Sequence, residues 1–378
     1  MPKQKNFTRI RRAKNLNTIY GLPPESYTDD VFWKKECNTV LSDDWLFVGL
    51  VHELKNPGDI IPLSIAGKPI FLVKDLENKI STFHNVCSHR CLKLVGEKKN
   101  VGKIIKCPYH AWSYNLKGQL KAAPHIGGTN QHKPEGFNFS DHGLKPIRTH
   151  IWHDWIFINF NGKAKKFEEY AKPLIKRFND IDLTKLNYVA TLDFGKINTN
   201  WKFLIENFIE PYHVQFVHKT TTNQPLRDHY TFVDGKCYGS GVDVEQEDAK
   251  NGSALSVTSR YLSLFPNFII GTYFPNQVGV YLNIPISPGV TSQKRIIYTT
   301  DSKEMTKKEI QATKDIWWSV HKEDHEICER LQEGRSSPAS NNGGLLSPVW
   351  EKGVQAFQKL IMNSIRRSFK MTRRIKNV

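Results

Sequence analysis

Two short segments, each with one cysteine and one histidine, constrain the fold of this sequence more than any other feature. They read CSH at residues 87–89 and CPYH at residues 107–110. Within each segment the two side chains are only two or three residues apart, so both can reach one metal site from a single tight loop. The four candidate ligands are Cys87, His89, Cys107 and His110.

The order of these ligands distinguishes between two kinds of metal site. Structural zinc sites usually pair cysteine with cysteine and histidine with histidine along the chain, whereas each loop here offers one of each. The alternation favours a binuclear iron–sulfur cluster in which one iron takes both cysteines and the other takes both histidines. A mixed zinc site with two cysteines and two histidines is the alternative.

The apolar pattern divides the chain into two parts. Short apolar segments separated by turn residues, such as WLFVGLV and DWIFINF, recur over residues 44–161 and predict an all-β domain. Beyond them, helical patterns are mixed with strand patterns. Helices are expected at 165–179, 199–219, 304–333 and 349–370, and strands at 187–195, 229–245 and 258–300. We therefore predict an α+β protein, in which the all-β domain is inserted before a helix-plus-antiparallel-sheet domain at 162–378 and residues 1–43 pack on the latter.

A second group of possible metal ligands lies in NWKFLIENFIEPYHVQFVHK, residues 200–219. His213 and His218 together with one carboxylate would form a facial triad, which leaves coordination positions open for O₂. Positions i and i+5 of a regular helix point about 140° apart, so both histidines can face one metal only where the helix is irregular. Pro211 or a π-type turn would supply that irregularity.

These residues resemble those of a known family. CSHRCLKLV and CPYHAWSYNLKGQL are similar to the Rieske domain of the Rieske non-haem iron oxygenases, and the resemblance extends over about residues 31–370. It implies that the four candidate ligands in the two Cys–His segments hold a [2Fe–2S] Rieske cluster. Cys91 departs from the family pattern, which usually has a small residue such as glycine there. We expect Cys91 to be a free, packed thiol and not a fifth ligand.

The resemblance also implies roles for the second group of residues. His213 and His218 would bind a catalytic mononuclear Fe(II) in the domain at 162–378. Asp324, in the segment HKEDHEICERLQEG, would be the third ligand; the alternative is a solvated acid on a charged helix that also carries Glu323, Glu326 and Glu329. Asn207 matches an asparagine that the family keeps beside the iron.

The resemblance further implies the activity and the assembly. Glu210 would bridge His213 to His110 of a neighbouring subunit, which requires a head-to-tail ring and predicts a homotrimer. Electrons would come from NAD(P)H indirectly, through a separate flavin reductase or ferredoxin, and O₂ would be the co-substrate. The expected enzyme is an oxidoreductase, either a monooxygenase or a dioxygenase.

The substrate follows from a narrower likeness. A glutamate at position 210, where many aromatic-ring dioxygenases have aspartate, resembles the branch with the choline, glycine betaine and carnitine oxygenases. A quaternary ammonium substrate would need an aromatic cage. The candidates are Phe208, Tyr212, Tyr273 and Phe274, and ordinary core packing is the alternative for each. An oxygenase of aromatic rings or aromatic acids is the second possibility.

Two other classes of protein must be weighed. A Rieske electron carrier without catalytic iron would need only the all-β domain, so the second group of ligands argues against it. The net charge of +17 would suit nucleic acid binding, but no nucleic-acid motif accompanies it. Twelve of the charges lie in the terminal segments 3–14 and 366–376, which we interpret as solvated tails, or as a docking surface for the reductase. We expect no membrane segment, no secretory signal and a cytoplasmic protein.

Overall fold

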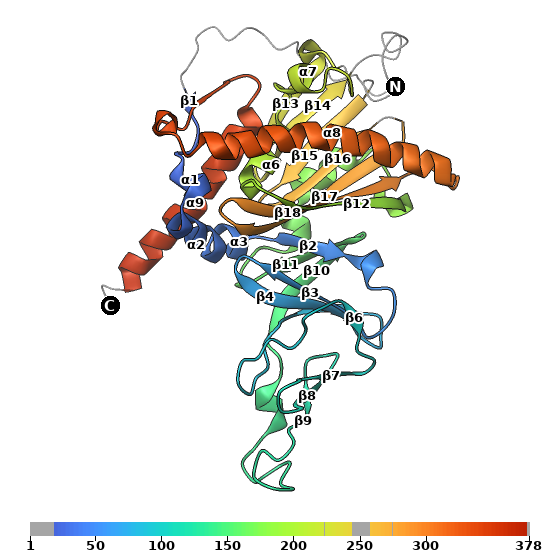
Figure 1. Ribbon diagram of the computed structural model, residues 1–378, viewed down its shortest axis with the longest axis vertical. Helices are drawn as coiled ribbons and strands as arrows, with labels where there is room; N and C mark the ends of the chain where they lie inside the picture. The colour runs from blue at the N-terminus through green and yellow to red at the C-terminus, as the bar shows by residue number, and fades with distance from the viewer. Residues whose placement is uncertain (1–18, 223, 244–257, 274, 376–378) are drawn as a thin grey trace. The chain divides into compact units, whose positions relative to one another are not determined.

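The computed structural model of the protein describes residues 19–222, 224–243, 258–273 and 275–375, with side chains of the last helix as far as residue 367. The chain divides into two compact units. One consists of residues 37–167, and the other consists of the described residues in 1–36 and 168–378. The long helices belong to the second unit (Figure 1).

The unit of residues 37–167 is built from antiparallel strands. Its elements are α3 (Val40–Asp43), β2 (Leu46–Leu50), the 3-10 turn η1 (Val51–Glu53), β3 (Asp59–Ile65), β4 (Lys68–Lys74), β5 (Ile80–His84), β6 (Lys99–Asn100), β7 (Ile104–Lys106), β8 (Ser113–Asn115), β9 (Leu120–Ala122), η2 (Phe139–His142), β10 (Pro146–Trp152) and β11 (Trp155–Asn159). Seven strands pair in the order β2-β11-β10-β5-β4-β3-β6, and three more form the sheet β7-β8-β9. The apolar strands β2 and β11 are buried throughout, which explains their unbroken hydrophobic runs.

The second unit combines a seven-stranded antiparallel sheet with helices. Its short elements are β1 (Ile19–Tyr20), α1 (Glu25–Thr28), α2 (Asp30–Asn38), which crosses the boundary between the units, α4 (Phe167–Tyr170), α5 (Lys172–Ile175), η3 (Lys176–Phe178), η4 (Leu183–Lys185), α7 (Val214–Val217), η5 (Leu226–Asp228), η8 (Pro338–Ser340) and β19 (Leu345–Leu346). Its long elements are β12 (Asn187–Ile197), α6 (Trp201–Ile209), β13 (His229–Asp234), β14 (Cys237–Asp243), β15 (Thr258–Leu264), β16 (Phe268–Tyr273), β17 (Gln277–Ser287), β18 (Val290–Thr299), α8 (Lys307–Gly334) and α9 (Lys352–Ile375). The strands pair in the order β12-β18-β17-β16-β15-β14-β13.

Helix α6 has a central place in this unit. It contacts both long helices, α8 and α9, and also strands β14, β15 and β17 of the sheet. Its start is fixed by Asn200, whose side chain accepts a hydrogen bond from the backbone N–H of Lys202. Helix α8 starts with a capping box, in which Thr306 and Glu309 satisfy each other's backbone N–H groups. These caps set the register of the two helices that carry the candidate catalytic residues.

The predicted fold class is confirmed, because helices and antiparallel sheets coexist as expected. The strand predicted at 187–195 and the helix predicted at 304–333 correspond to β12 and α8. The helical prediction at 165–179 is confirmed in part: the segment is helical, but it is divided into the short helices α4, α5 and η3 and does not form one continuous helix. Pro173 lies in the first turn of α5, where its missing N–H prevents the helix from continuing from α4.

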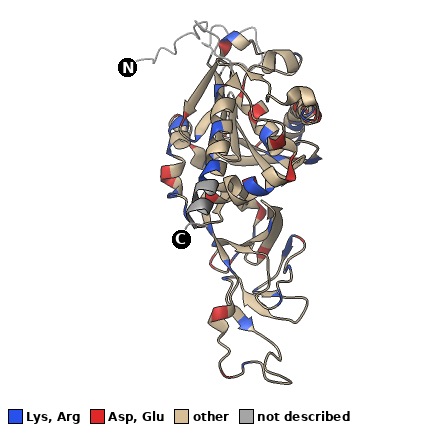
Figure 2. Ribbon diagram, turned by 90° about the vertical axis from the view of Figure 1, so that its left-hand side faces the viewer, with Lys and Arg blue, Asp and Glu red and all other residues tan. Residues whose placement is uncertain are grey.

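The charged residues are spread over both units. Figure 2 shows Lys and Arg beside Asp and Glu along the ribbon, with neither sign confined to one unit. The basic segment 3–14 and the end of segment 366–376 lie outside the described residues. Among the helices that the structure describes, none is both long and apolar enough to cross a membrane.

Candidate metal centres

The loops after β5 and β7 share one backbone geometry. In the first, Cys87 donates its N–H to the carbonyl of Leu92, and Cys91 donates to the carbonyl of Cys87. In the second, Cys107 donates to the carbonyl of Trp112 and Ala111 donates to that of Cys107. Each cysteine is thus followed by the same tight turn, which presents a histidine two or three residues later.

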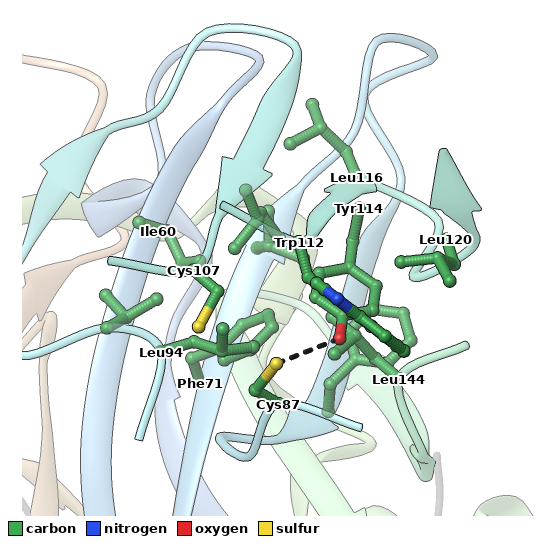
Figure 3. Packing of buried hydrophobic residues seen from close by; sticks show 14 of the residues in the cluster. Ile60, Phe71, Cys87, Leu94, Cys107, Trp112, Tyr114, Leu116, Leu120 and Leu144 are labelled. Atoms are coloured by element: carbon green, nitrogen blue, oxygen red, sulfur yellow. Dashed lines mark hydrogen bonds between the residues drawn. The ribbon is translucent and has the colours of Figure 1, made fainter. Parts of the chain in front are cut away.

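The side chains of these loops differ in burial in a way that suits a two-sided cluster. Cys87 and Cys107 are buried, unbridged thiols within an apolar cluster that also contains Trp112 and Tyr114 (Figure 3). His89 is partly exposed and His110 is exposed. The ring centroids of His89 and His110 lie 4.7 Å apart, and the ring of His89 stacks on Trp112 at 4.9 Å. The donor set therefore fits two cysteine ligands on the inner side and two histidine ligands on the outer side.

Tyr114 contributes a polar contact to this otherwise apolar environment. Its hydroxyl lies 3.2 Å from Sγ of Cys87 (Figure 3). It also accepts a hydrogen bond from the backbone N–H of Ser88. Burial raises the pKa of the Cys87 thiol, and the Tyr114 hydroxyl acts in the opposite direction. A hydroxyl at this place can stabilise a thiolate ligand, since hydrogen bonds to the sulfur are among the factors that tune such clusters.

The interpretation of Cys91 as a packed thiol is wrong. Its side chain is exposed, although the thiol is free as expected. Its φ is 57°, in the left-handed region, as is that of Ala111 in the other loop. Glycine is the residue that adopts this conformation without steric cost, so Cys91 bears a cost at this position that glycine would not.

The second group of candidate ligands is brought together by the interruption of the helix after α6. The helix ends at Ile209, Glu210 is extended with φ −106° and ψ 140°, and Pro211 follows. A residue that precedes proline is disfavoured in the helical region, so the helix expected over 199–219 is interrupted here. His213 and His218 then flank the single turn α7, one at each end.

Ligand atoms of three residues converge beside this turn. Donor atoms of His213, His218 and Asp324 all lie within 4.8 Å of one another. Nε2 of His218 is 3.1 Å and Nε2 of His213 is 3.6 Å from Oδ1 of Asp324. Oδ1 of Asp324 is buried without a hydrogen bond of good geometry. A buried carboxylate oxygen left in this state between two imidazoles suits coordination to a cation.

Each histidine is oriented by a further acid. Nδ1 of His213 lies 2.7 Å from Oε1 of Glu210, and Nδ1 of His218 lies 2.7 Å from Oε2 of Glu323. Both imidazoles therefore keep Nε2 for the side of Asp324, which is the usual arrangement around a metal. Glu323 also accepts a hydrogen bond from Thr221 Oγ1 at 2.8 Å. The role of Glu323 was missed by the sequence reasoning, which treated it only as a neighbour of Asp324.

The pKa values show how strongly these groups interact. Burial lowers the pKa of His218, but the carboxylates of Asp324 and Glu323 outweigh it and raise the pKa to about 9. Burial raises the pKa of Asp324, but His218 and His213 lower it to about 2. Three carboxylates surround two imidazoles in this site, and a divalent cation would balance their negative charge.

A cavity opens beside the three converging residues. Its lining includes Asn207, Phe208, Glu210 and the aromatic residues Tyr261, Tyr273, Tyr281 and Trp317. Of the predicted substrate residues, Phe208 and Tyr273 lie on this lining. Tyr212 does not: it is 44% exposed and its ring packs on Phe216. Phe274 lies outside the described residues.

Two family models match the chain. Residues 44–133 match the Rieske [2Fe-2S] domain. Residues 183–366 match the ring hydroxylating alpha subunit (catalytic domain). The first match contains all four candidate cluster ligands, and the second contains the three residues that converge beside α7.

Individual proteins are similar over different lengths. The large oxygenase component of salicylate 5-hydroxylase from Ralstonia sp. is 31% identical over 52% of this chain, and the alignment spans 48% of that protein, about half its length. Chloroplastic choline monooxygenase from Atriplex hortensis is 26% identical over 89% of this chain and 76% of its own length. A quaternary ammonium Rieske monooxygenase solved with L-carnitine shares the fold, with a TM-score of 0.76, 21% identity and coverage of 92% of this chain and 96% of that chain.

Proposed function

Because the chain belongs to the Rieske non-haem iron oxygenases, as an alpha subunit with a Rieske domain and a ring-hydroxylating catalytic domain, we propose that it hydroxylates a quaternary ammonium compound. The reaction would use O₂ and electrons from a separate flavin reductase or ferredoxin. The product would arise by hydroxylation at carbon or by N-demethylation. A cytoplasmic location belongs to the same proposal.

The observation that carries this proposal is the convergence of His213, His218 and Asp324 within 4.8 Å. An electron carrier would have no use for a second buried site with two oriented imidazoles. We propose that these three residues hold a mononuclear iron, and that Cys87, His89, Cys107 and His110 hold the [2Fe–2S] cluster. When bound, the cluster supplies electrons and the iron supplies open positions for O₂.

The chain's own side chains would prepare this chemistry. Glu210 and Glu323 hold Nδ1 of the two histidines and so direct Nε2 toward Asp324. The apolar and aromatic lining keeps bulk water from the substrate. Asn207, on the last turn of α6, lines the same cavity and can hydrogen-bond a polar group there. Each of these groups would orient a ligand or bind the substrate.

Glu210 also supports a proposal on assembly. It is extended at the end of α6 and bonded to Nδ1 of His213 through one oxygen. We propose that it links His213 to His110 of a neighbouring subunit in a homotrimer. The exposure of His110 is consistent with such a contact.

The substrate class is supported by the relatives and by the aromatic cavity. The choline monooxygenase aligns over most of this chain. Aromatic rings of Phe208 and Tyr261 lie 5.8 Å apart, edge to face, on the lining, and such faces attract a cation. A second candidate is hydroxylation of an aromatic acid, which the 31% identity with salicylate 5-hydroxylase favours.

The test is a metal analysis of protein prepared without oxygen. Wild type should contain about three irons and two acid-labile sulfides per chain. Asp324→Ala should keep the sulfide and fall to about two irons. Glu326→Ala, an acid 70% exposed on the same helix, is the matched control and should equal wild type.

Other metal and sulfide contents would contradict the proposed function. About two irons and two sulfides in wild type as well as in Asp324→Ala would reduce the protein to an electron carrier. Zinc without sulfide would overturn the cluster as well. If the iron content is as expected, turnover of betaines against aromatic acids separates the two substrate classes.

A further inference from the structure

A buried arginine stands behind the aromatic wall of the cavity. Arg295 on β18 is fully buried, and it is the cross-strand partner of Tyr281 on β17. Its guanidinium lies 3.3 Å from the ring centroid of Trp317 and 5.0 Å from those of Tyr273 and Tyr281. All three of these rings line the cavity. No carboxylate among the described residues forms an ion pair with Arg295.

The hydrogen bonds of Arg295 are incomplete. Nη1 donates to the hydroxyl of Tyr281 and lies 3.4 Å from Nε2 of His321. Nε and Nη2 have no hydrogen-bond partner in the described part of the chain. The three rings attract the guanidinium, but they do not replace a counter-ion, and a buried charge without one is costly.

The hydroxyls of Tyr273 and Tyr281, next to Arg295, have one more hydrogen-bond donor than they have acceptors. Arginine only donates hydrogen bonds, so Tyr281 Oη accepts from it and keeps its own proton to donate. Tyr273 Oη lies 3.3 Å from Tyr281 Oη, and no other hydrogen bond is made by these two hydroxyls within the described residues. One O–H of the pair can point at the other oxygen. Whichever does so, the second O–H is left without an acceptor, on the wall of the cavity.

The backbone is shaped to hold this arrangement. Gly271 and Gly279 are cross-strand partners in β16 and β17. A Cβ on Gly271 would lie 2.4 Å from Tyr273 Oη, and one on Gly279 would lie 2.6 Å from Nη2 of Arg295. Any larger residue at either place would displace the hydroxyl or the guanidinium. These two paired glycines thus leave room for the hydroxyl of Tyr273 and the buried guanidinium of Arg295.

We propose that the hydroxyl pair of Tyr273 and Tyr281 binds a carboxylate of the substrate, with the charge of Arg295 as its counter-charge. The inference deepens the proposed function: within that function, the substrate is a betaine, with a carboxylate as well as a quaternary ammonium group. A second cation on the rings beside Arg295 would be repelled by it. The ammonium group therefore belongs near Phe208 and Tyr261, which are not among the three rings that Arg295 contacts.

The test measures binding to the metal-loaded full chain by titration calorimetry. Glycine betaine and choline both carry a trimethylammonium group, but only the first has a carboxylate. γ-Butyrobetaine extends the distance between the charges, and salicylate has a carboxylate without the ammonium. The variants are Tyr273→Phe and Tyr281→Phe, because either hydroxyl can carry the free proton. Tyr188→Phe removes an exposed hydroxyl on β12 and is the control.

We expect at least one betaine to bind about tenfold more tightly than choline. At least one of the two cavity variants should lose about tenfold for that betaine, with the affinity for choline unchanged and Tyr188→Phe equal to wild type. The inference is overturned if choline binds as tightly as the betaines, if neither variant distinguishes the two ligands, or if no carboxylate binds. Salicylate bound in a variant-sensitive way without any betaine would uphold the carboxylate site and refute the quaternary ammonium substrate. Binding of choline alone would uphold the quaternary ammonium substrate and refute the carboxylate site.

Discussion

Cys91 and Ala111 hold equivalent positions in two loops of the same geometry. Both have a φ of 57°, and both donate the backbone N–H to the carbonyl of the cysteine at the start of their loop. The two halves of the cluster site are therefore built by one repeated turn, although their sequences share little beyond the cysteine and the histidine.

This conformation predicts that Cys91→Gly stabilises the protein. A side chain in the left-handed region costs about 1 kcal/mol relative to glycine, and Cys91 is exposed, so no packing is lost. The melting temperature should rise, with the visible absorption of the cluster unchanged. Ala122→Gly, in strand β9 at negative φ, should lower it. A fall in the melting temperature of Cys91→Gly would show that the thiol itself stabilises the loop.

The contact between Glu323 and His218 predicts weaker iron binding in Glu323→Gln. The carboxylate holds Nδ1 of His218 at 2.7 Å and so keeps Nε2 turned toward Asp324. Loss of such a partner typically costs about 10- to 100-fold in metal affinity. Chelator titration of the mononuclear iron measures this, and Glu326→Gln should behave as wild type. Equal chelator resistance in the two variants would leave Glu323 without a role in orienting His218.

The N-terminal segment is tied to α6 by a buried hydrogen-bond network. The hydroxyl of Tyr27 donates to Glu206 Oε1 at 2.9 Å and accepts from Gln358 Nε2 at 3.1 Å. Tyr27→Phe leaves these partners short of one bond and should lower the free energy of unfolding by about 1–3 kcal/mol. Denaturant unfolding is the measurement, and Tyr20→Phe, at a tyrosine 55% exposed, should have no effect. An equally small effect of both substitutions would contradict the importance of the network.

Glu351 predicts a pH dependence of stability. Burial raises its pKa to about 7, although the backbone N–H of Ser347 acts in the opposite direction. Because the folded-state pKa lies above the unfolded one, the contribution to stability is present below about pH 4.5 and is lost as the pH rises through about 7.

Replacement of Glu351 should remove this dependence. Glu351→Gln should gain stability relative to wild type between pH 5 and pH 8, by about 1 kcal/mol once the partial exposure of Glu351 is allowed for. Melting temperatures at the two pH values measure the gain. A constant difference between Glu351→Gln and wild type across this range would show that Glu351 does not titrate there.

Much of this molecule can be predicted from local patterns. The spacing within each Cys–His loop points to the cluster, and the capped, periodic segment of α8 could be placed because its signals lie within the helix itself. The position of Asp324 was implied by family resemblance alone. Nothing local distinguishes it from Glu323 or Glu326, since only the packing of α8 against the segment after α6 decides which acid faces His213 and His218.

The features that were missed depend on contacts between distant segments. Arg295 stands in a strand with alternating polar residues and has no local sign of burial. Its environment comes from Gly279 on the next strand and from Trp317 on α8. Tyr212 follows Pro211 closely in sequence, and the turn after the proline directs it to solvent. Tertiary packing decides the environments of these residues, and the periodicity of the sequence carries no information about it.

Helix α8 limits where insertions and deletions can be tolerated in this sequence. Asp324 and Glu323 serve the two sides of His218 from one rigid, 28-residue element. One residue inserted between Thr306 and Glu323 would rotate both carboxylates by about 100° around the helix axis and so dismantle the site at a distance. An insertion of the same size in residues 341–344, after the helix, would leave it whole. Natural length variation should therefore accumulate beyond α8 and spare residues 307–322, between its cap and its two acids.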